Sequence, residues 1–310
     1  MKRAAILDLG TNTFNLLIVE KNSDSTFDIL VNKRIPVKLG ESKINSGEII
    51  PVAYKRGIEA IETYSKIIGE YQPDVIKAFG TSAFRTANNG KKFLSEIKEK
   101  TALEIEIIPG EKEAELIYLG VKQSLNFTKE KFLILDIGGG SNELIIADME
   151  KIYWKKSYPL GIARLIEKFL PSDPLSADEI SKINAYLAEN LQDLFKQLKK
   201  YQIEIFVGAS GSFETFLTML RQIEVSDLEC ILQEISTEMD IDAFCKLHKK
   251  LEKSTLNDRM QMKGLEPMRI EMIVLASLFV KFILDNHNFK RLIQSNYSLK
   301  EGAVTELIMN

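Results

Sequence analysis

One motif occurs twice in the 310-residue chain, as AILDLGTNTFNLLIVE at residues 5–20 and as LILDIGGGSNELIIAD at residues 133–148. The two segments align without a gap, and Asp8 falls opposite Asp136. Each copy has an apolar run, an aspartate, a loop of glycine and hydroxyl residues, and a second apolar run, which is typical of a β-hairpin. The repeat predicts two lobes that begin alike, through duplication of one α/β unit.

Short apolar or alternating runs predict strands, and longer runs with helical spacing predict helices. In the first part of the chain, strands are expected at residues 4–9, 14–19, 27–31, 74–80 and 103–110, and helices at 52–69, 91–100 and 111–125. After the second hairpin we expect a third strand in KIYWKKSYPLG, one long helix from a capping box at Ser176 to about Lys200, and strands at 203–212 and in KRLIQSNYS. Helical patterns dominate the remainder.

These alternating elements predict an α/β protein with a mixed sheet in each lobe. The N-terminal lobe would comprise residues 1–125 and the C-terminal lobe residues 126–310, with a hinge near residues 125–131 and a last helix that could pack back on the first lobe.

Composition limits the classes of partner. The net charge of −3 gives no general attraction to nucleic acid, so a phosphate-rich ligand would need a local positive site. No apolar run is long enough for a membrane span, and the N-terminus lacks a signal-peptide pattern. Two cysteines, Cys230 and Cys245, are expected to be free thiols in a reducing cytoplasm. We therefore expect a cytoplasmic protein with neither a nucleic-acid nor a membrane partner.

The two repeated loops predict an anion site, because backbone N–H groups and hydroxyls line a turn of this kind. The candidate phosphate-binding residues are Gly10, Thr11, Asn12 and Thr13 in the first loop, and Gly138, Gly139, Gly140 and Ser141 in the second. An aspartate at the mouth of each loop would repel phosphate unless a divalent cation such as Mg²⁺ lies between them. The alternative is two ordinary hairpin turns, but two matching copies favour a cleft that holds a phosphate chain. Neither loop matches a P-loop or a dinucleotide fingerprint.

Several further segments carry a resemblance. DLGTNTFNLLIVE, GTSAFRTANNG, GEKEAELIYLGV, DIGGGSNELIIAD, YPLGIARLIE and VGASGSFET occur in the order and spacing of the exopolyphosphatase/guanosine pentaphosphate phosphohydrolase (Ppx/GppA) family, and the chain resembles its short two-domain form. The resemblance covers nearly the whole chain. It implies two ribonuclease H-like lobes of the actin, Hsp70 and sugar-kinase superfold with a cleft between them. Members of the family often form dimers, so a homodimer is a further expectation.

The resemblance also implies roles for the acidic residues. Glu113 would position or deprotonate the attacking water, and Glu111 is the alternative if the alignment shifts by two residues. Glu143 would join Asp136 around the metal or the water, and the metal ligands would be Asp8, Asp136 and Glu143, with Mg²⁺ or Mn²⁺ as the ion. From the residues alone, a glutamate at a helix start is more often a solvated charge.

Arg85 is the expected phosphate clamp, because its planar fork can bind two oxygens; an ion pair with a nearby acid is the alternative. Ser82 could orient the loop or reach the substrate. A third glycine loop, with Gly208, Ser210 and Gly211, corresponds to one near the substrate channel of the family, although a simple strand-to-helix turn is its alternative. The lysines at 196–200 and 246–253 are expected mostly on helix surfaces, but some of them could face the cleft and supply the positive charge that it requires.

Three positions depart from the family pattern and affect the finer substrate contacts: Lys38 and Lys300 replace common arginines, and Met268 replaces a usual acid. The leading hypothesis is hydrolysis of the terminal phosphoanhydride of inorganic polyphosphate. Removal of the 5′ γ-phosphate of guanosine pentaphosphate, a nucleotide-binding regulator without turnover, and an ATP-dependent sugar or acyl kinase are the alternatives. Only the second loop is followed by an extra acid, Glu143 in place of Asn15, so metal and water chemistry should lie nearer that loop.

Overall fold

The computed structural model describes residues 2–23, 26–41, 43–127, 129–223 and 234–309, and within these the strands form two sheets. The first sheet has the order β3-β2-β1-β4-β5, and the second has the order β10-β11-β9-β6-β7-β8. The strands of the first are β1 (Arg3–Leu9), β2 (Thr13–Lys21), β3 (Phe27–Pro36), β4 (Val75–Gly80) and β5 (Glu106–Ile107). Those of the second are β6 (Phe132–Ile137), β7 (Asn142–Ala147), β8 (Ile152–Tyr158), β9 (Ile205–Ala209), β10 (Ser236–Met239) and β11 (Arg291–Ser295).

The repeated motif forms equivalent hairpins. Strands β1 and β2 pair antiparallel with Asp8 opposite Asn15, and β6 and β7 pair antiparallel with Asp136 opposite Glu143. Each first strand also pairs in parallel with the strand that follows later in its own sheet, β4 for β1 and β9 for β6. The two sheets are therefore built around the same arrangement, as the repeat predicted.

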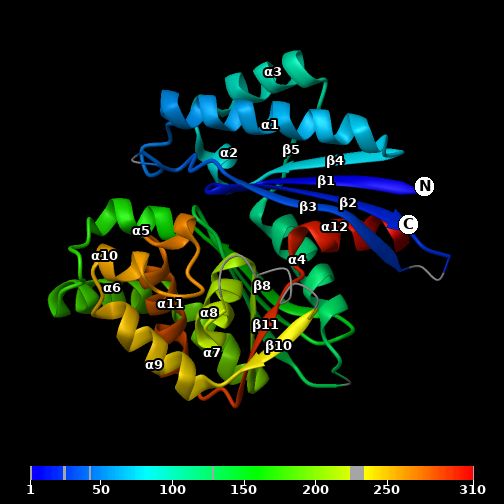
Figure 1. Ribbon diagram of the computed structural model, residues 1–310. Helices are drawn as coiled ribbons and strands as arrows, with labels where there is room; N and C mark the ends of the chain where they lie inside the picture. The colour runs from blue at the N-terminus through cyan, green and yellow to red at the C-terminus, as the bar shows by residue number, and fades with distance from the viewer. Residues whose placement is uncertain (1, 24–25, 42, 128, 224–233, 310) are drawn as a thin grey trace.

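Helices and sheets alternate in five layers (Figure 1). Helices α1 (Pro51–Tyr71) and α3 (Gly90–Thr101) cover the outer face of the first sheet. Helices α4 (Gly110–Ser124) and α12 (Leu299–Met309) lie between the two sheets. The outer face of the second sheet is covered by α5 (Ile162–Phe169), α6 (Ala177–Asn190), α7 (Gln192–Tyr201), α8 (Gly211–Arg221), α9 (Ile241–Glu252) and α11 (Ile273–Asn286). The short helices are α2 (Ser82–Thr86), α10 (Leu256–Met260) and the 3-10 turn η2 (Pro267–Arg269).

The apolar runs of the inner strands follow from this layering. Along β1, Ala4 and Ile6 face the middle helices, while Ala5, Leu7 and Leu9 pack toward α1 and α3. A strand covered on both faces has no solvated side, so its sequence is continuously apolar. The expectation of two α/β lobes, each with a mixed sheet, is confirmed.

Two glycines allow α4 and α12 to touch through their backbones. A β-carbon added at Gly302 would lie 1.7 Å from the carbonyl oxygen of Leu116, and one added at Gly120 would lie 1.9 Å from that of Ser298. No side chain fits there. The contact fixes the two helices relative to one another, and both begin beside the cleft described below.

Two expectations about the helices and strands were wrong. The segment from Ser176 to Lys200 is not one helix: α6 ends at Asn190 and α7 begins at Gln192. The Asn190 side chain donates to the carbonyl of Tyr186 at 2.7 Å, and asparagine favours such local bonds over continuing a helix. The expected capping box at Ser176 is present.

The second error concerns β10, which lies where helical patterns were expected. This strand, with the sequence STEM, pairs antiparallel with β11, and Glu238 lies opposite Ile293. Its four residues contain little apolar signal, so pairing with a distant strand decides its conformation.

Cys245 is a half-buried free thiol, and Cys230 lies outside the described residues. Across the described ranges, no helix combines the length and the apolar character that a membrane crossing requires.

Candidate active site

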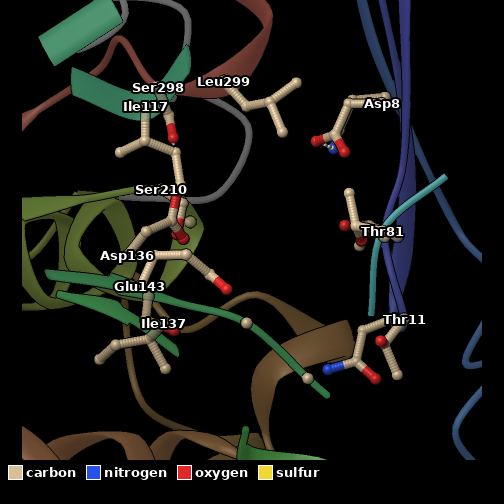
Figure 2. Close-up of a pocket in the computed structure, with 18 of the residues that line it drawn as sticks. Asp8, Thr11, Thr81, Ile117, Asp136, Ile137, Glu143, Ser210, Ser298 and Leu299 are labelled. Carbon is tan, nitrogen blue, oxygen red and sulfur yellow. Dashed lines mark hydrogen bonds between the residues drawn. The ribbon is translucent and has the colours of Figure 1, made fainter. Parts of the chain in front are cut away.

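A pocket lies between the two lobes where the hairpin loops meet (Figure 2). Asp8, Thr11 and Thr81 line the side of the first lobe, and Asp136 and Glu143 line the side of the second. The predicted site residues in this lining are Asp8, Gly10, Thr11, Asn12, Thr13, Ser82, Glu113, Asp136, Gly138, Gly139, Gly140, Ser141, Glu143, Ser210 and Gly211. Residues far apart in the sequence are thus brought together as the repeat predicted.

Two of the predicted residues, Arg85 and Gly208, lie behind this lining and not in it. Gly208 packs under the ring of Phe213, where an added β-carbon would lie 2.0 Å from a ring atom. Gly208 therefore supports the third loop from below, while Ser210 and Gly211 reach the pocket.

The two hairpin loops close with the same bond. The N–H of Gly10 donates to the carbonyl of Thr13 at 3.0 Å, and the N–H of Gly138 donates to the carbonyl of Ser141 at 3.0 Å. The sequence repeat is therefore also a repeat of backbone geometry at the pocket.

The loops of the two lobes touch each other. A β-carbon added at Gly139 would lie 2.3 Å from Nδ2 of Asn12, and one added at Gly140 would lie 2.6 Å from the hydroxyl oxygens of both Ser82 and Thr11. A side chain at Gly139 or Gly140 would therefore have to displace side chains of the first lobe. The Thr11 hydroxyl is buried and has no hydrogen-bond partner, so it is available to a ligand.

Asp8 and Asp136 are half-buried acids on opposite sides of the pocket (Figure 2). Burial raises the pKa of Asp8 to about 6; a 2.9 Å bond from Asn15 opposes this shift, and the charge of Asp136 adds to it. Burial also raises the pKa of Asp136, against hydrogen bonds from Ser298 and Ser210. Ser210 has φ +67°, a strained conformation of the kind that concentrates at functional sites.

Glu113 and Glu143 form a second pair of buried acids. Burial raises the pKa of Glu143 to about 7, although the Ser157 hydroxyl donates to it at 2.6 Å. Burial, and next the charge of Glu143, raise the pKa of Glu113 well above its ordinary value. A carboxylate whose pKa is raised toward neutrality is a suitable general base. Glu111, the alternative to Glu113, is exposed and faces Lys155 at 3.7 Å.

Arg85 holds Glu113 in place. One terminal nitrogen of its guanidinium donates to Glu113 at 2.6 Å and to the carbonyl of Ile108 at 3.0 Å, and the other donates to the Ser141 hydroxyl at 3.2 Å. The arrangement is the ion pair that was the alternative to a phosphate clamp. Direct binding of phosphate by Arg85 stays a prediction.

The sequence analysis missed a cluster of charged side chains in the pocket. Arg34 of β3 donates to Glu266 at 2.6 Å and to Glu214 at 3.2 Å, and so joins the first sheet to the second lobe. Arg269 lies against Gly211, where an added β-carbon would be 1.8 Å from a guanidinium nitrogen. The Nε atom of Arg269 and one carboxylate oxygen of Glu266 are buried without a hydrogen-bond partner.

The positive charge of the cleft comes from Arg34 and Arg269, with Lys33 and Lys300 also in the lining. The lysines at 196–200 and 246–253 do not line the pocket, because α7 and α9 belong to the outer layer of the second lobe. The basic residues of the cleft are therefore not the expected lysines, and they lie beside five acids of the same lining, Asp8, Glu113, Asp136, Glu143 and Glu214. Lys300, one of the three departures from the family pattern, pairs with the buried Glu301 at 2.6 Å.

The predicted metal ligands do not come together as a set of three. Within the described ranges, no three Asp, Glu, His or Cys side chains lie close enough to hold one ion. The reason is that Asp8 belongs to the first lobe and bonds Asn15, whereas Glu143 belongs to the second and bonds Ser157. Asp8 and Asp136 alone still fit Mg²⁺, because they line the same pocket from its two sides and a cation between them would offset the cost of ionising two poorly solvated carboxyls. Mg²⁺ commonly takes one or two carboxylates and completes its shell with water and phosphate oxygens.

Comparison with known proteins finds relatives along the whole chain. The model of the Ppx/GppA phosphatase family matches residues 17–310. The bifunctional 3-dehydroquinate synthase/phosphatase of Fusobacterium nucleatum is 31% identical over 316 residues, which cover 99% of this chain and 46% of that protein. The guanosine-5′-triphosphate,3′-diphosphate pyrophosphatase of Photobacterium profundum is 26% identical, with 98% of this chain and 59% of that protein covered.

A solved structure is similar over nearly its full length. The crystal structure of an exopolyphosphatase from Cytophaga hutchinsonii is 32% identical and superposes with a TM-score of 0.93, covering 99% of this chain and 98% of the other. The chain thus spans roughly half the length of the two curated relatives above and nearly all of this solved relative.

Proposed function

The chain belongs to the Ppx/GppA phosphatase family, whose members are hydrolases that act on phosphoanhydrides, and we propose that it releases the terminal phosphate of inorganic polyphosphate. The observation that carries the proposal is that two like hairpin loops, one from each lobe, line one pocket beside the buried carboxyl of Glu113. Two loops can hold successive phosphates of one chain, which a single loop cannot.

Different residues of the pocket would bind different parts of the substrate. The N–H groups and hydroxyls of both loops would surround the terminal phosphate oxygens. Arg34, Arg269 and Lys300 would attract the rest of the chain into the cleft. Asp8 and Asp136 would hold Mg²⁺ or Mn²⁺, which would supply positive charge for phosphate oxygens.

Glu113 would accept a proton from the attacking water. Its raised pKa makes it a stronger base than an ordinary glutamate, and Arg85 fixes the orientation of its carboxylate. Glu143 would keep this basicity high through its charge, which is the second cause of the raised pKa of Glu113. Catalysis would therefore rest on positioning and charge stabilisation, as in phosphoryl transfer generally.

Removal of the 5′ γ-phosphate of guanosine pentaphosphate is the second candidate. The pocket extends beyond the loops to Gln294, whose Oε1 atom is buried without a partner, and to Glu214 and Arg269. Such mixed donors and acceptors suit a base or a ribose as well as a phosphate. A regulator without turnover is less favoured, because every acid of the proposed mechanism is present.

Closure of the cleft would require the two lobes to move as units. We infer that residues 1–125 and 126–310 are these units, except that α12 packs on the first lobe and would move with it. The segment 125–131 would be the hinge, and its Thr128 lies outside the described residues. The cytoplasm as the location, and a homodimer as the assembly, stay predictions.

The test is phosphate release measured side by side on polyphosphate, guanosine pentaphosphate and ATP, with Mg²⁺, with Mn²⁺ and with EDTA. Polyphosphate should be hydrolysed fastest, and EDTA should abolish release. Glu113→Gln should lower kcat by about 10²- to 10⁴-fold with KM retained. Glu111→Gln, two residues away on the same helix but exposed, is the matched control and should keep full activity. Undiminished turnover in Glu113→Gln would refute the assignment of the base, and preference for another substrate would refute that of polyphosphate.

A further inference from the structure

We propose that Arg164 is a positioning residue that sets the second glycine loop, residues 138–141, and locks that loop to the first lobe. The inference rests on the proposed function in one respect: the loop is taken to bind phosphate. Arg164 itself lies on α5, behind the pocket lining, so its effect would be indirect.

Helix α5 begins by binding the loop through its backbone. The N–H of Ile162 donates to the carbonyl of Gly138 at 3.0 Å, and the N–H of Ala163 donates to that of Gly139 at 2.9 Å. Gly161 makes this approach feasible, because an added β-carbon would lie 2.4 Å from the loop backbone.

The Arg164 side chain binds the next carbonyl of the loop. Its Nε atom donates to the carbonyl of Gly140 at 2.7 Å. Three successive carbonyls of the loop are thus engaged by the first three residues of α5. Carbonyl oxygens held in this way cannot turn toward a phosphate and repel it, so the loop keeps its N–H groups for the anion.

The rest of the guanidinium binds the first lobe. One terminal nitrogen donates to the carbonyl of Ile44 and to the side-chain oxygen of Asn45, both at 3.2 Å, and the other donates to the Thr86 hydroxyl at 3.1 Å. The contact is reciprocal, because the Asn45 side chain donates to the carbonyl of Arg164 at 3.2 Å, and its backbone N–H donates to Glu167 at 3.0 Å. A single planar group with several donors therefore bridges both lobes.

Thr86 connects this bridge to the residues around Glu113. Thr86 is the last residue of α2, the helix that also carries Ser82, which touches Gly140, and Arg85, which holds Glu113. Through one guanidinium, the second loop is therefore tied to the helix that orients the base. A displacement of about 1 Å between base and phosphate can cost about 100-fold in rate.

The experiment combines steady-state kinetics with hydrogen exchange at residues 138–141, measured without substrate. In Arg164→Ala, kcat/KM on polyphosphate should fall about 100-fold. Added guanidinium should restore part of this loss. The amide hydrogens of the loop should exchange faster than in wild type. Arg164→Lys should keep only part of the wild-type kcat/KM and of the slow exchange of the loop, because an ammonium cannot reach four acceptors at once. Lys168→Ala, on the same helix, is the control and should match wild type in both measurements.

A second variant covers the case in which Arg164→Ala does not fold. Asn45→Ala combined with Thr86→Val removes acceptors in the first lobe and leaves α5 intact; it should also lower kcat/KM and speed exchange of the loop. Unchanged exchange and unchanged kcat/KM in this double variant would overturn the proposal. The exchange result does not depend on the substrate, so a wild-type protein that releases no phosphate from polyphosphate would refute the proposed function alone.

Discussion

Replacing Asp8 by asparagine should stabilise the metal-free protein at pH 8. Burial raises the pKa of this carboxyl from 3.8 to about 6, and at about 1.36 kcal/mol per pKa unit the difference corresponds to about 3 kcal/mol. Ionised Asp8 therefore lowers the free energy of unfolding of the wild-type protein by this amount. Asparagine carries no charge, and its side-chain oxygen can still accept the bond from Asn15.

The sign follows from proton linkage. The folded state holds the Asp8 proton to a higher pH than the unfolded chain does, so stability falls as the pH rises from about 4 through about 6. Below pH 4 the carboxyl is neutral in both states, and the advantage of Asp8→Asn should vanish. Urea unfolding in EDTA at pH 8 and at the lowest pH where both proteins fold measures the difference directly.

Asp74→Asn is the control with the opposite expectation. The backbone N–H groups of Arg3 and Lys2 donate to this exposed carboxylate and lower its pKa, so its replacement should not stabilise the protein. An Asp8→Asn variant no more stable than wild type at pH 8, or one whose advantage does not change with pH, would refute the reasoning.

Three further outcomes are expected. Gly302→Ala should destabilise the fold by about 3 kcal/mol, since its β-carbon would lie 1.7 Å from a backbone oxygen of α4. Gly69→Ala, at a helical position with open space around it, should instead stabilise the fold by about 1 kcal/mol. Urea unfolding of both variants and of wild type measures the two changes. Arg85→Lys should lower kcat about tenfold or more, because one ammonium cannot keep the bonds to both Glu113 and Ser141; unchanged kinetics would contradict its orienting role. Mg²⁺ should raise the melting temperature of wild type but not of Asp8→Asn, as followed by thermal shift.

The loops could be predicted from the sequence because their signal is local and occurs twice. An aspartate followed by glycines and hydroxyls interrupts an apolar run in each copy, and the register of Asp8 with Asn15 and of Asp136 with Glu143 follows from hairpin geometry. The position of Glu113 at the start of a helix could also be predicted from neighbouring residues, but its burial between the two lobes could not.

The ion pairs of Arg34 could not be predicted, because they depend on how distant segments meet. Arg34 lies within a strand that carries no motif, and its partners Glu214 and Glu266 are 180 and 232 residues away. The same holds for β10, which only its pairing with β11 makes a strand. Local patterns identified the parts of the site that chain turns create, and missed those that lobe packing creates.

The middle layer has a consequence for how the chain is made. Helix α12 leaves the ribosome after every other described helix, yet it covers a face of the first sheet that includes Ala4 and Ile6. At about 5–20 residues per second, that face is synthesised on the order of 15 to 60 s before α12 can cover it. Until then the nascent first lobe leaves an apolar strip beside α4 without its cover, so the first lobe reaches its final packing only when the last helix has been made.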